Sequence, residues 1–279
     1  MGRSGLLGAG LLIGLGLDCA GAPRSSGDAD DDLTALEPVA RELPAASKPA
    51  AAEDALLSHR EPEAPPPGAP PGTRYAALTH EACAAELASR SIVHEALPPR
   101  LGIASPVRLH GPLSGVSFRT LWPEPERART SFEIIDCRLV LALDDFAKLL
   151  RAHGIIDVMF FSAYRPPPAG WKESASTAGV HRHEAGLAID IGYFGKADHT
   201  ALNVERDFMP RSPLEHERIC APAPPPKDAT PEAIELRRIA CEAAAAQLFH
   251  VTLTPAYDSV HRDHFHLELA PDKTDFVAR

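Results

Sequence analysis

Histidine and carboxylate residues gather in two short segments in the second half of the chain. In the first, Asp190 follows His183 by seven residues; in the second, His264 and His266 are separated by a single residue. Two imidazole nitrogens and one carboxylate oxygen are ordinary ligands of Zn²⁺, and they leave a fourth tetrahedral position for water. Zinc held in this way lowers the pKa of water toward neutrality and polarises a carbonyl group. These residue types therefore predict metal-assisted hydrolysis.

The second segment alternates polar and apolar residues, as a β-strand does. Its two faces are Phe265, Leu267 and Leu269 on one side and His264, His266 and Glu268 on the other. We expect the apolar face to pack on the core and the polar face to point into a cavity or into solvent. The two imidazoles can share one metal ion, or one can bind metal while the other transfers protons. Taken alone, the pattern is equally typical of a polar strand edge in solvent.

The first segment favours a metal site over that simpler interpretation. Its expected strand has Gly186, Ala188 and Asp190 on one face and Leu187, Ile189 and Ile191 on the core face. The small residues leave space beside the Asp190 carboxylate, and His183 sits at the turn that leads into the strand. A histidine, an aspartate and a distant histidine then supply the three ligands.

The elements that must position these residues are helices and short strands in mixed order. We predict helices over residues 80–91, 137–153 and 231–249, and strands over residues 155–164, 186–193 and 264–269. This order favours an α+β domain over a doubly wound one. The expected architecture is a small antiparallel sheet that carries the metal site and is flanked by helices.

The N-terminal residues indicate export. Arg3 precedes a short apolar stretch from Leu6 to Leu17, which is short for a membrane span and typical of a signal peptide over residues 1–19. Cleavage after the small residues 20–22 and lipid attachment at Cys19 both remain open, and the second would tether the chain to a membrane. The expected location is the periplasm or cell envelope, including an outer-membrane lipoprotein.

Composition then divides the rest of the chain. Residues 20–73 are rich in Ala, Pro and acidic residues and hold no aromatic residue, so we expect a disordered tether there. Residues 74–279 form the expected folded domain. The formal net charge is −10 and no stretch is rich in Lys and Arg, which argues against nucleic acid as a partner.

Apart from Cys19, the chain contains four cysteines, an even number that in an exported protein suggests two disulfides. Three pairings are formally open for four cysteines. We favour Cys83–Cys137 and Cys220–Cys241, because the second pair closes a proline-rich loop that lacks regular structure. Free buried thiols are the alternative.

The paired motifs also resemble a known group of enzymes. His183 and Asp190 with His264 and His266 resemble the metallopeptidase superfamily that includes lysostaphin-type endopeptidases, D-Ala-D-Ala peptidases and the hedgehog signalling domain. With His261 added, the last motif resembles the penicillin-insensitive murein endopeptidases. The likeness extends furthest to bacterial proteins with an extensin-like C-terminal domain, over about Cys137 to Leu269.

The resemblance implies a role for each matching residue. It makes His183, Asp190 and His266 the zinc ligands. It makes His264 the general base or the group that polarises water, and His261 a group that stabilises the oxyanion or aligns His264.

The resemblance also concerns Arg165, and the sequence departs from the family pattern at two positions. Arg165 matches an arginine that could bind a substrate carboxylate, with a structural pair to a surface acid as the alternative. Asp263 stands where the D-Ala-D-Ala peptidases have glutamate, and its expected direction away from the site favours His264 as the base. His181 replaces a serine of the family pattern and is expected near the site or on the surface.

The resemblance and the export signal together predict an extensin-like, zinc-peptidase-like domain. The expected activity is hydrolysis of stem or cross-link peptides of peptidoglycan, of the DD-endopeptidase or DD-carboxypeptidase type. The alternative is a non-catalytic, metal-containing protein that binds the cell wall or has a structural role in the envelope.

Overall fold

The structure is a computed structural model that describes residues 66–279, apart from residues 104, 169–181, 210–218, 222–223 and 226. Its helices are α1 (Pro71–Ala76), α2 (His80–Ser89), α3 (Glu124–Arg127), α4 (Cys137–Ala152), α5 (Val204–Asp207), α6 (Pro231–Ala245) and the 3₁₀ helix η2 (Ser259–His261). Its strands are β1 (His94–Ala96), β2 (Pro106–Leu109), β3 (Ser117–Thr120), β4 (Ile134–Asp136), β5 (Ile155–Ser162), β6 (Ala188–Lys196), β7 (Ala201–Asn203), β8 (Val251–Leu253), β9 (Phe265–Glu268) and β10 (Val277–Ala278).

The predicted signal peptide, Cys19 and most of the predicted tether lie outside the described residues. Within the described residues, regular structure begins with α1 at Pro71, three residues before the predicted start of the domain at Arg74. Tyr75 of this helix is buried, and its hydroxyl contacts Asp145 of α4. Within the part of the chain that the structure covers, no helix combines the length and apolar character needed to cross a membrane.

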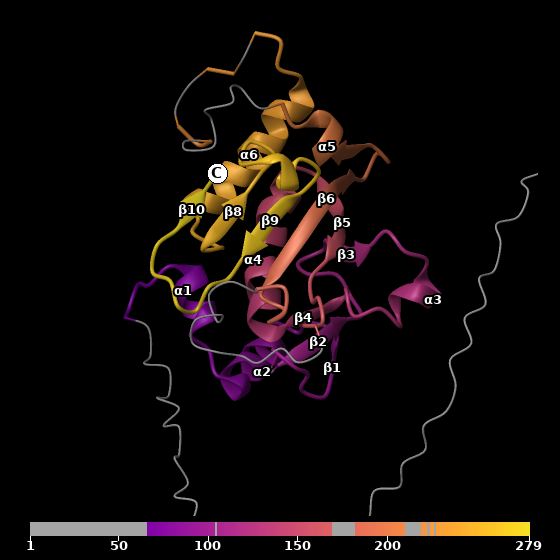
Figure 1. Cartoon of the computed structure of the whole chain (residues 1–279), viewed down its shortest axis with the longest axis vertical. Helices are drawn as coiled ribbons and strands as arrows, with labels where there is room; N and C mark the ends of the chain where they lie inside the picture. The colour runs from indigo at the N-terminus through magenta and orange to yellow at the C-terminus, as the bar shows by residue number, and fades with distance from the viewer. Residues whose placement is uncertain (1–65, 104, 169–181, 210–218, 222–223, 226) are drawn as a thin grey trace, which may run out of the picture. The chain divides into compact units, whose positions relative to one another are not determined.

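The strands form two sheets (Figure 1). A three-stranded antiparallel sheet has the order β1-β2-β4, and a seven-stranded sheet has the order β10-β8-β9-β6-β5-β3, with β7 also paired to β6. The α+β class is therefore confirmed, but the prediction of a small antiparallel sheet is wrong. The larger sheet is mixed, because β3 pairs with β5 and β10 pairs with β8 in parallel. The chain between β3 and β5 contains α4, and a crossover of that length returns a strand in parallel.

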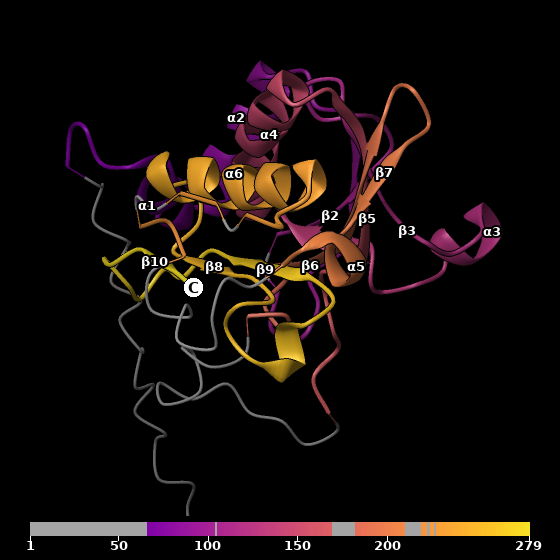
Figure 2. The same ribbon diagram turned by 90° about the horizontal axis from the view of Figure 1, so that it is seen from above.

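Helices α4 and α6 cover one face of the larger sheet (Figure 2). The apolar stripe of α4 is buried along its length, and Asp136 caps its first turn by accepting a hydrogen bond from the Arg138 amide. Ring contacts tie α4 to the sheet, since Phe146 lies 6.5 Å from Phe194 of β6 and 5.6 Å from Phe249, between ring centroids. This helical layer leaves the opposite face of the sheet for the polar residues.

Helix α6 begins as predicted, with Pro231 in the first turn and the Thr230 hydroxyl accepting from the Ala233 amide. It ends at Ala245, before the predicted end at Phe249. Gln247 has a φ of 51°, which is incompatible with a continuing right-handed helix. The turn sends Phe249 into the core ahead of β8.

Strands β6 and β9 pair directly in the centre of the larger sheet. In their antiparallel register, Asp190 lies opposite His266, and Ala188 lies opposite Glu268. The intervening apolar residues of both strands belong to the core. Asp190 and His266 therefore share the face opposite α4 and α6, and Figure 2 shows η2, the short yellow turn of helix, on that same side of the sheet.

The part of the chain that the structure describes contains two disulfides, Cys83–Cys137 and Cys220–Cys241, and they are the pairs favoured from the sequence. The first joins α2 to the start of α4, and both of its cysteines are buried. The second joins the segment before α6 to the third turn of that helix. Each disulfide therefore fixes one of the helices that pack in the core.

Candidate metal centre

His183, Asp190 and His266 lie together, and one donor atom from each is within 4.8 Å of the other two. Nε2 of His183 is 3.2 Å from Oδ2 of Asp190, and Nδ1 of His266 is 3.0 Å from Oδ1 of Asp190. Asp190 is only 1% exposed. The structure thus brings together, around one buried carboxylate, the three residues that the sequence predicts as ligands.

The outer nitrogen of each imidazole has a hydrogen-bond acceptor. Nδ1 of His183 is 2.7 Å from the carbonyl oxygen of Ala163, and Nε2 of His266 is 3.2 Å from Oε2 of Glu268. Carbonyl and ionised carboxylate oxygens only accept, so the tautomer with its proton on the outer nitrogen satisfies these oxygens and leaves the lone pair of the inner nitrogen for a metal. Histidines that bind metal have this arrangement. The donor set fits a Zn²⁺ ion with two nitrogens and one oxygen.

The turn that holds His183 depends on Gly186. Its φ is +64°, a conformation that glycine adopts without steric penalty. A Cβ at this position would lie 2.3 Å from Cδ1 of Ile103 and 3.0 Å from the backbone nitrogen of Asp136. The Gly186 amide also donates to the His183 carbonyl at 3.1 Å, which closes the turn directly under the histidine.

His264 lies beside the three donors without belonging to the set. Its Nε2 is 3.3 Å from Oδ1 of Asp190, and its Nδ1 is 2.8 Å from Oδ1 of Asp263. Asp263 contacts the ring nitrogen of His264 that faces away from Asp190, a contact that is possible because both residues precede β9 and do not alternate as strand residues do. Asp263 is an orienting group for His264 that the sequence analysis missed.

His261 lies on η2 next to these rings. Its ring centroid is 5.2 Å from that of His264 and 5.8 Å from that of His266. Nδ1 of His261 is 2.7 Å from Oδ1 of Asp258, which also accepts from the His261 amide and caps η2. Asp258 thus fixes His261 at the border of the site.

Arg165 also reaches the centre. Its Nη2 contacts Oδ2 of Asp190, and its Nε donates to the Ser162 hydroxyl at 2.9 Å. Arg165 thus pairs with an acid, as in the structural alternative, but this acid is the buried Asp190 and not a surface residue. About half of the Arg165 side chain, 51%, remains exposed to solvent. His181, the other residue considered near the site, lies outside the described residues.

The charges in this cluster stabilise one another. Burial alone would raise the pKa of Asp190, but hydrogen bonds from His183, His264 and His266 hold it well below its usual range. Burial would lower the pKa of His266, but its bonds to Asp190 and Glu268 raise it to about 9. Asp190 is therefore an anion at neutral pH that attracts cations to this point.

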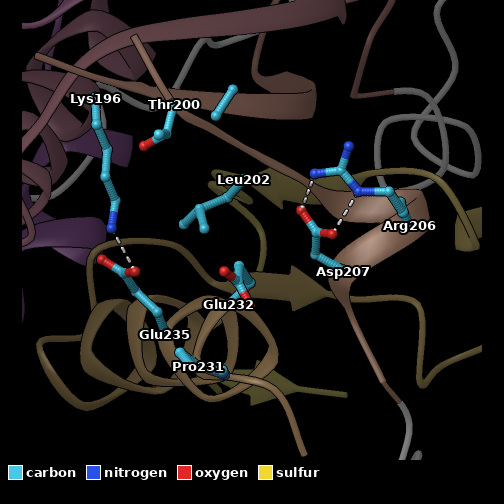
Figure 3. Close-up of a pocket in the computed structure, with 9 residues that line it drawn as sticks. Lys196, Thr200, Leu202, Arg206, Asp207, Pro231, Glu232 and Glu235 are labelled. Atoms are coloured by element: carbon cyan, nitrogen blue, oxygen red, sulfur yellow. Dashed lines mark hydrogen bonds and ion pairs between the residues drawn. The ribbon is translucent and has the colours of Figure 1, made fainter. Parts of the chain in front are cut away.

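A separate pocket of about 580 Å³ lies where β7, α5 and the start of α6 meet (Figure 3). It contains none of the predicted site residues. Four of its five charged side chains pair with each other, as Lys196 with Glu235 and Arg206 with Asp207. Because most of the charges in this pocket neutralise one another, the cluster around Asp190 is the stronger candidate site.

The C-terminal part of the chain is similar to one known family. Residues 227–277 match the family model for the extensin-like protein C-terminus. This stretch runs from just before α6 to the start of β10 and contains His261, His264 and His266. No curated protein and no solved structure matches the chain.

Proposed function

We propose that this protein is a zinc-dependent peptidase that hydrolyses peptide bonds in peptidoglycan, as a DD-endopeptidase or DD-carboxypeptidase. The observation that carries the proposal is the position of His264. Its Nε2 faces the Asp190 carboxylate, and its Nδ1 is held by Asp263. A site that only stored metal would not require this oriented imidazole beside three donors.

In the proposed centre, His183, Asp190 and His266 hold the ion. Bound zinc supplies a Lewis acid that acidifies water and polarises the scissile carbonyl. His264 accepts the proton of the attacking water at Nε2, while Asp263 stabilises the imidazolium that results. His261 donates to the developing oxyanion or aligns His264.

Arg165 binds a carboxylate of the substrate in this proposal. Half of its side chain is exposed, and its guanidinium already lies against Oδ2 of Asp190. A planar guanidinium can donate to two carboxylates through different edges. The choice of peptidoglycan as substrate depends on the resemblance to murein endopeptidases and on the export signal.

The deciding experiment incubates purified muropeptides with the zinc-loaded protein and analyses the products by mass spectrometry. We expect the wild type to cleave. We expect His264→Ala to keep its zinc and to lose activity by about 100-fold or more, the usual contribution of a general base. His110→Ala is the matched control, because His110 is an exposed imidazole paired with Glu95.

No cleavage by the wild type with zinc or other divalent metals would refute the peptidase. A zinc-loaded protein that binds peptidoglycan without cutting it would then support the non-catalytic alternative. Full activity of His264→Ala would show that the proton acceptor is a different residue.

A further inference from the structure

A carboxylate on β9 connects the metal centre to a buried arginine. Oε2 of Glu268 is 3.2 Å from Nε2 of His266, and Oε1 of Glu268 is 3.3 Å from Nε of Arg182. Glu268 is 9% exposed and Arg182 is 7% exposed. Each oxygen of the carboxylate therefore has its own partner, one at the site and one behind it.

The backbone explains why Arg182 meets Glu268. The Arg182 carbonyl accepts from the Leu187 amide at 2.9 Å, which closes the turn before β6. The Leu187 carbonyl in turn accepts from the Leu269 amide at 2.9 Å, next to Glu268. Two backbone hydrogen bonds thus bring the turn that contains Arg182 and His183 to the end of β9.

Arg182 has a further carboxylate partner on the other side. Its Nη2 contacts Oδ1 of Asp272, whose side chain is 46% exposed on the loop after β9. A buried charge is stable only when its partners compensate for lost hydration. Arg182 therefore lies between two carboxylates, and its guanidinium compensates for the burial of the Glu268 side chain.

We propose that Glu268 and Arg182 are positioning residues of the metal centre. Glu268 holds the His266 ring with Nε2 protonated, so that Nδ1 is presented to the metal. Arg182 fixes the Glu268 carboxylate and joins the turn of His183 to the strand of His266. The inference rests on the proposed metal centre but not on cleavage of any substrate.

The physical effect is both geometric and electronic. A carboxylate that accepts from the outer nitrogen fixes the tautomer of a ligand imidazole and makes its inner nitrogen more basic. A neutral amide at the same place can still accept the hydrogen bond but lacks the charge. Replacing Glu268 by Gln therefore tests the charge while preserving side-chain size.

The test measures zinc affinity by competition with a chromophoric chelator, and the visible absorption of the Co²⁺-loaded protein. We expect Glu268→Gln to bind Zn²⁺ 10- to 100-fold more weakly, the usual effect of removing such an outer partner. Its cobalt spectrum should also change, because the ligand field at His266 changes. The control is Glu235→Gln, which removes the charge of a carboxylate paired with Lys196 at 2.6 Å outside the centre.

Asp272→Asn provides a second, milder variant in case the buried substitution prevents folding. This substitution removes the charge of the exposed carboxylate that contacts Arg182. We therefore expect a smaller loss of zinc affinity than in Glu268→Gln. Thermal unfolding of the metal-free forms, compared with that of Glu235→Gln, measures any general loss of stability.

Zinc affinity and a cobalt spectrum unchanged from wild type in Glu268→Gln would overturn the inference, even if the variant were less stable. A wild type that binds neither ion would overturn it as well. Failure of the peptidase proposal is distinguishable, because a protein that cuts no muropeptide can still show the loss of affinity in Glu268→Gln.

Discussion

The Asp190 carboxylate makes most of the charged contacts of the candidate site. Three imidazoles and the Arg165 guanidinium surround its buried carboxylate. A buried carboxylate without such partners would take up a proton. The cluster is thus built around a permanent negative charge, and each histidine has an inner nitrogen that faces it.

Zinc binding should release protons from this cluster. In the metal-free protein, hydrogen bonds to Asp190 and Glu268 outweigh burial and raise the pKa of His266 to about 9, so its ring is charged at pH 7. A metal ligand must be neutral, so binding expels about one proton or more and strengthens as the pH rises toward 9. Calorimetry in buffers of different ionisation enthalpy measures this number. Binding heats independent of the buffer would contradict the prediction.

The raised pKa of His266 also predicts how the stability of the metal-free protein changes with pH. A raised histidine pKa stabilises the folded state fully below the unfolded value of 6.5, and this contribution is lost as the pH rises to about 9. Metal-free protein should therefore unfold at lower denaturant concentration at pH 9 than at pH 6.5. His266→Gln should reduce that difference.

At the scale of elements, the turn before β6 depends on the absence of a side chain at Gly186. We expect Gly186→Ala to lower the free energy of unfolding by roughly 2–4 kcal/mol, from the positive φ together with the collision with Ile103. Zinc affinity should fall as well, because His183 lies in the same turn. Denaturant unfolding and chelator competition measure the two effects.

Gly154→Ala is the matched control for this prediction. Gly154 also has a positive φ, +73°, but a Cβ there would meet no atom within 4 Å. It should show the conformational cost of about 1 kcal/mol without the collision and without any change in zinc affinity. Equal effects of the two substitutions would refute the steric argument.

The Cys83–Cys137 disulfide should contribute more to stability than Cys220–Cys241. The first closes a loop with a sequence separation of 54 residues and the second one of 21 residues. Chain entropy predicts about 4 kcal/mol for the longer loop and about 3 kcal/mol for the shorter one. Unfolding of the Cys83→Ala/Cys137→Ala and Cys220→Ala/Cys241→Ala variants tests the order. The reverse order would indicate that packing of the cysteines dominates.

The long elements could be predicted from the sequence because each has its own periodicity. Helix α4 and strand β5 follow their apolar patterns closely. The strands β3, β7 and β10 have two to four residues, too few for a pattern, and they exist through pairing with a neighbour. The extent and mixed direction of the larger sheet could not be seen for that reason.

The same distinction applies to the site. Strand alternation and spacing placed Asp190 and His266 on one face, as the register of β6 and β9 shows. Alternation in the sequence predicts on which face of a strand a side chain lies, but it does not predict which residue that side chain contacts. The contact of Asp263 with His264 arises in a turn, and the contact of Arg182 with Glu268 joins distant segments, so neither was predicted.

For the whole molecule, metal binding should stabilise the entire fold. The proposed ligands extend over 83 residues of the sequence, from His183 to His266, so an unfolded chain cannot offer the same centre. At a zinc concentration of 100 times Kd, the expected gain is about 2.7 kcal/mol. For a domain of this size that corresponds to a rise in Tm of roughly 5–10 °C.

Differential scanning fluorimetry with and without chelator measures this rise in Tm. His183→Ala and His266→Ala should each abolish most of it, and the exposed control His110→Ala should retain it. A zinc-dependent rise that persists in both ligand variants would place the ion elsewhere on the protein.

The division of the proposed ligands between two segments has an evolutionary consequence. The matched extensin-like stretch contains His266 but neither His183 nor Asp190. A relative could therefore keep this stretch intact while mutation of a single upstream residue removes its chemistry. In such relatives, metal binding should depend on the residue aligned with Asp190, which lies outside the matched stretch.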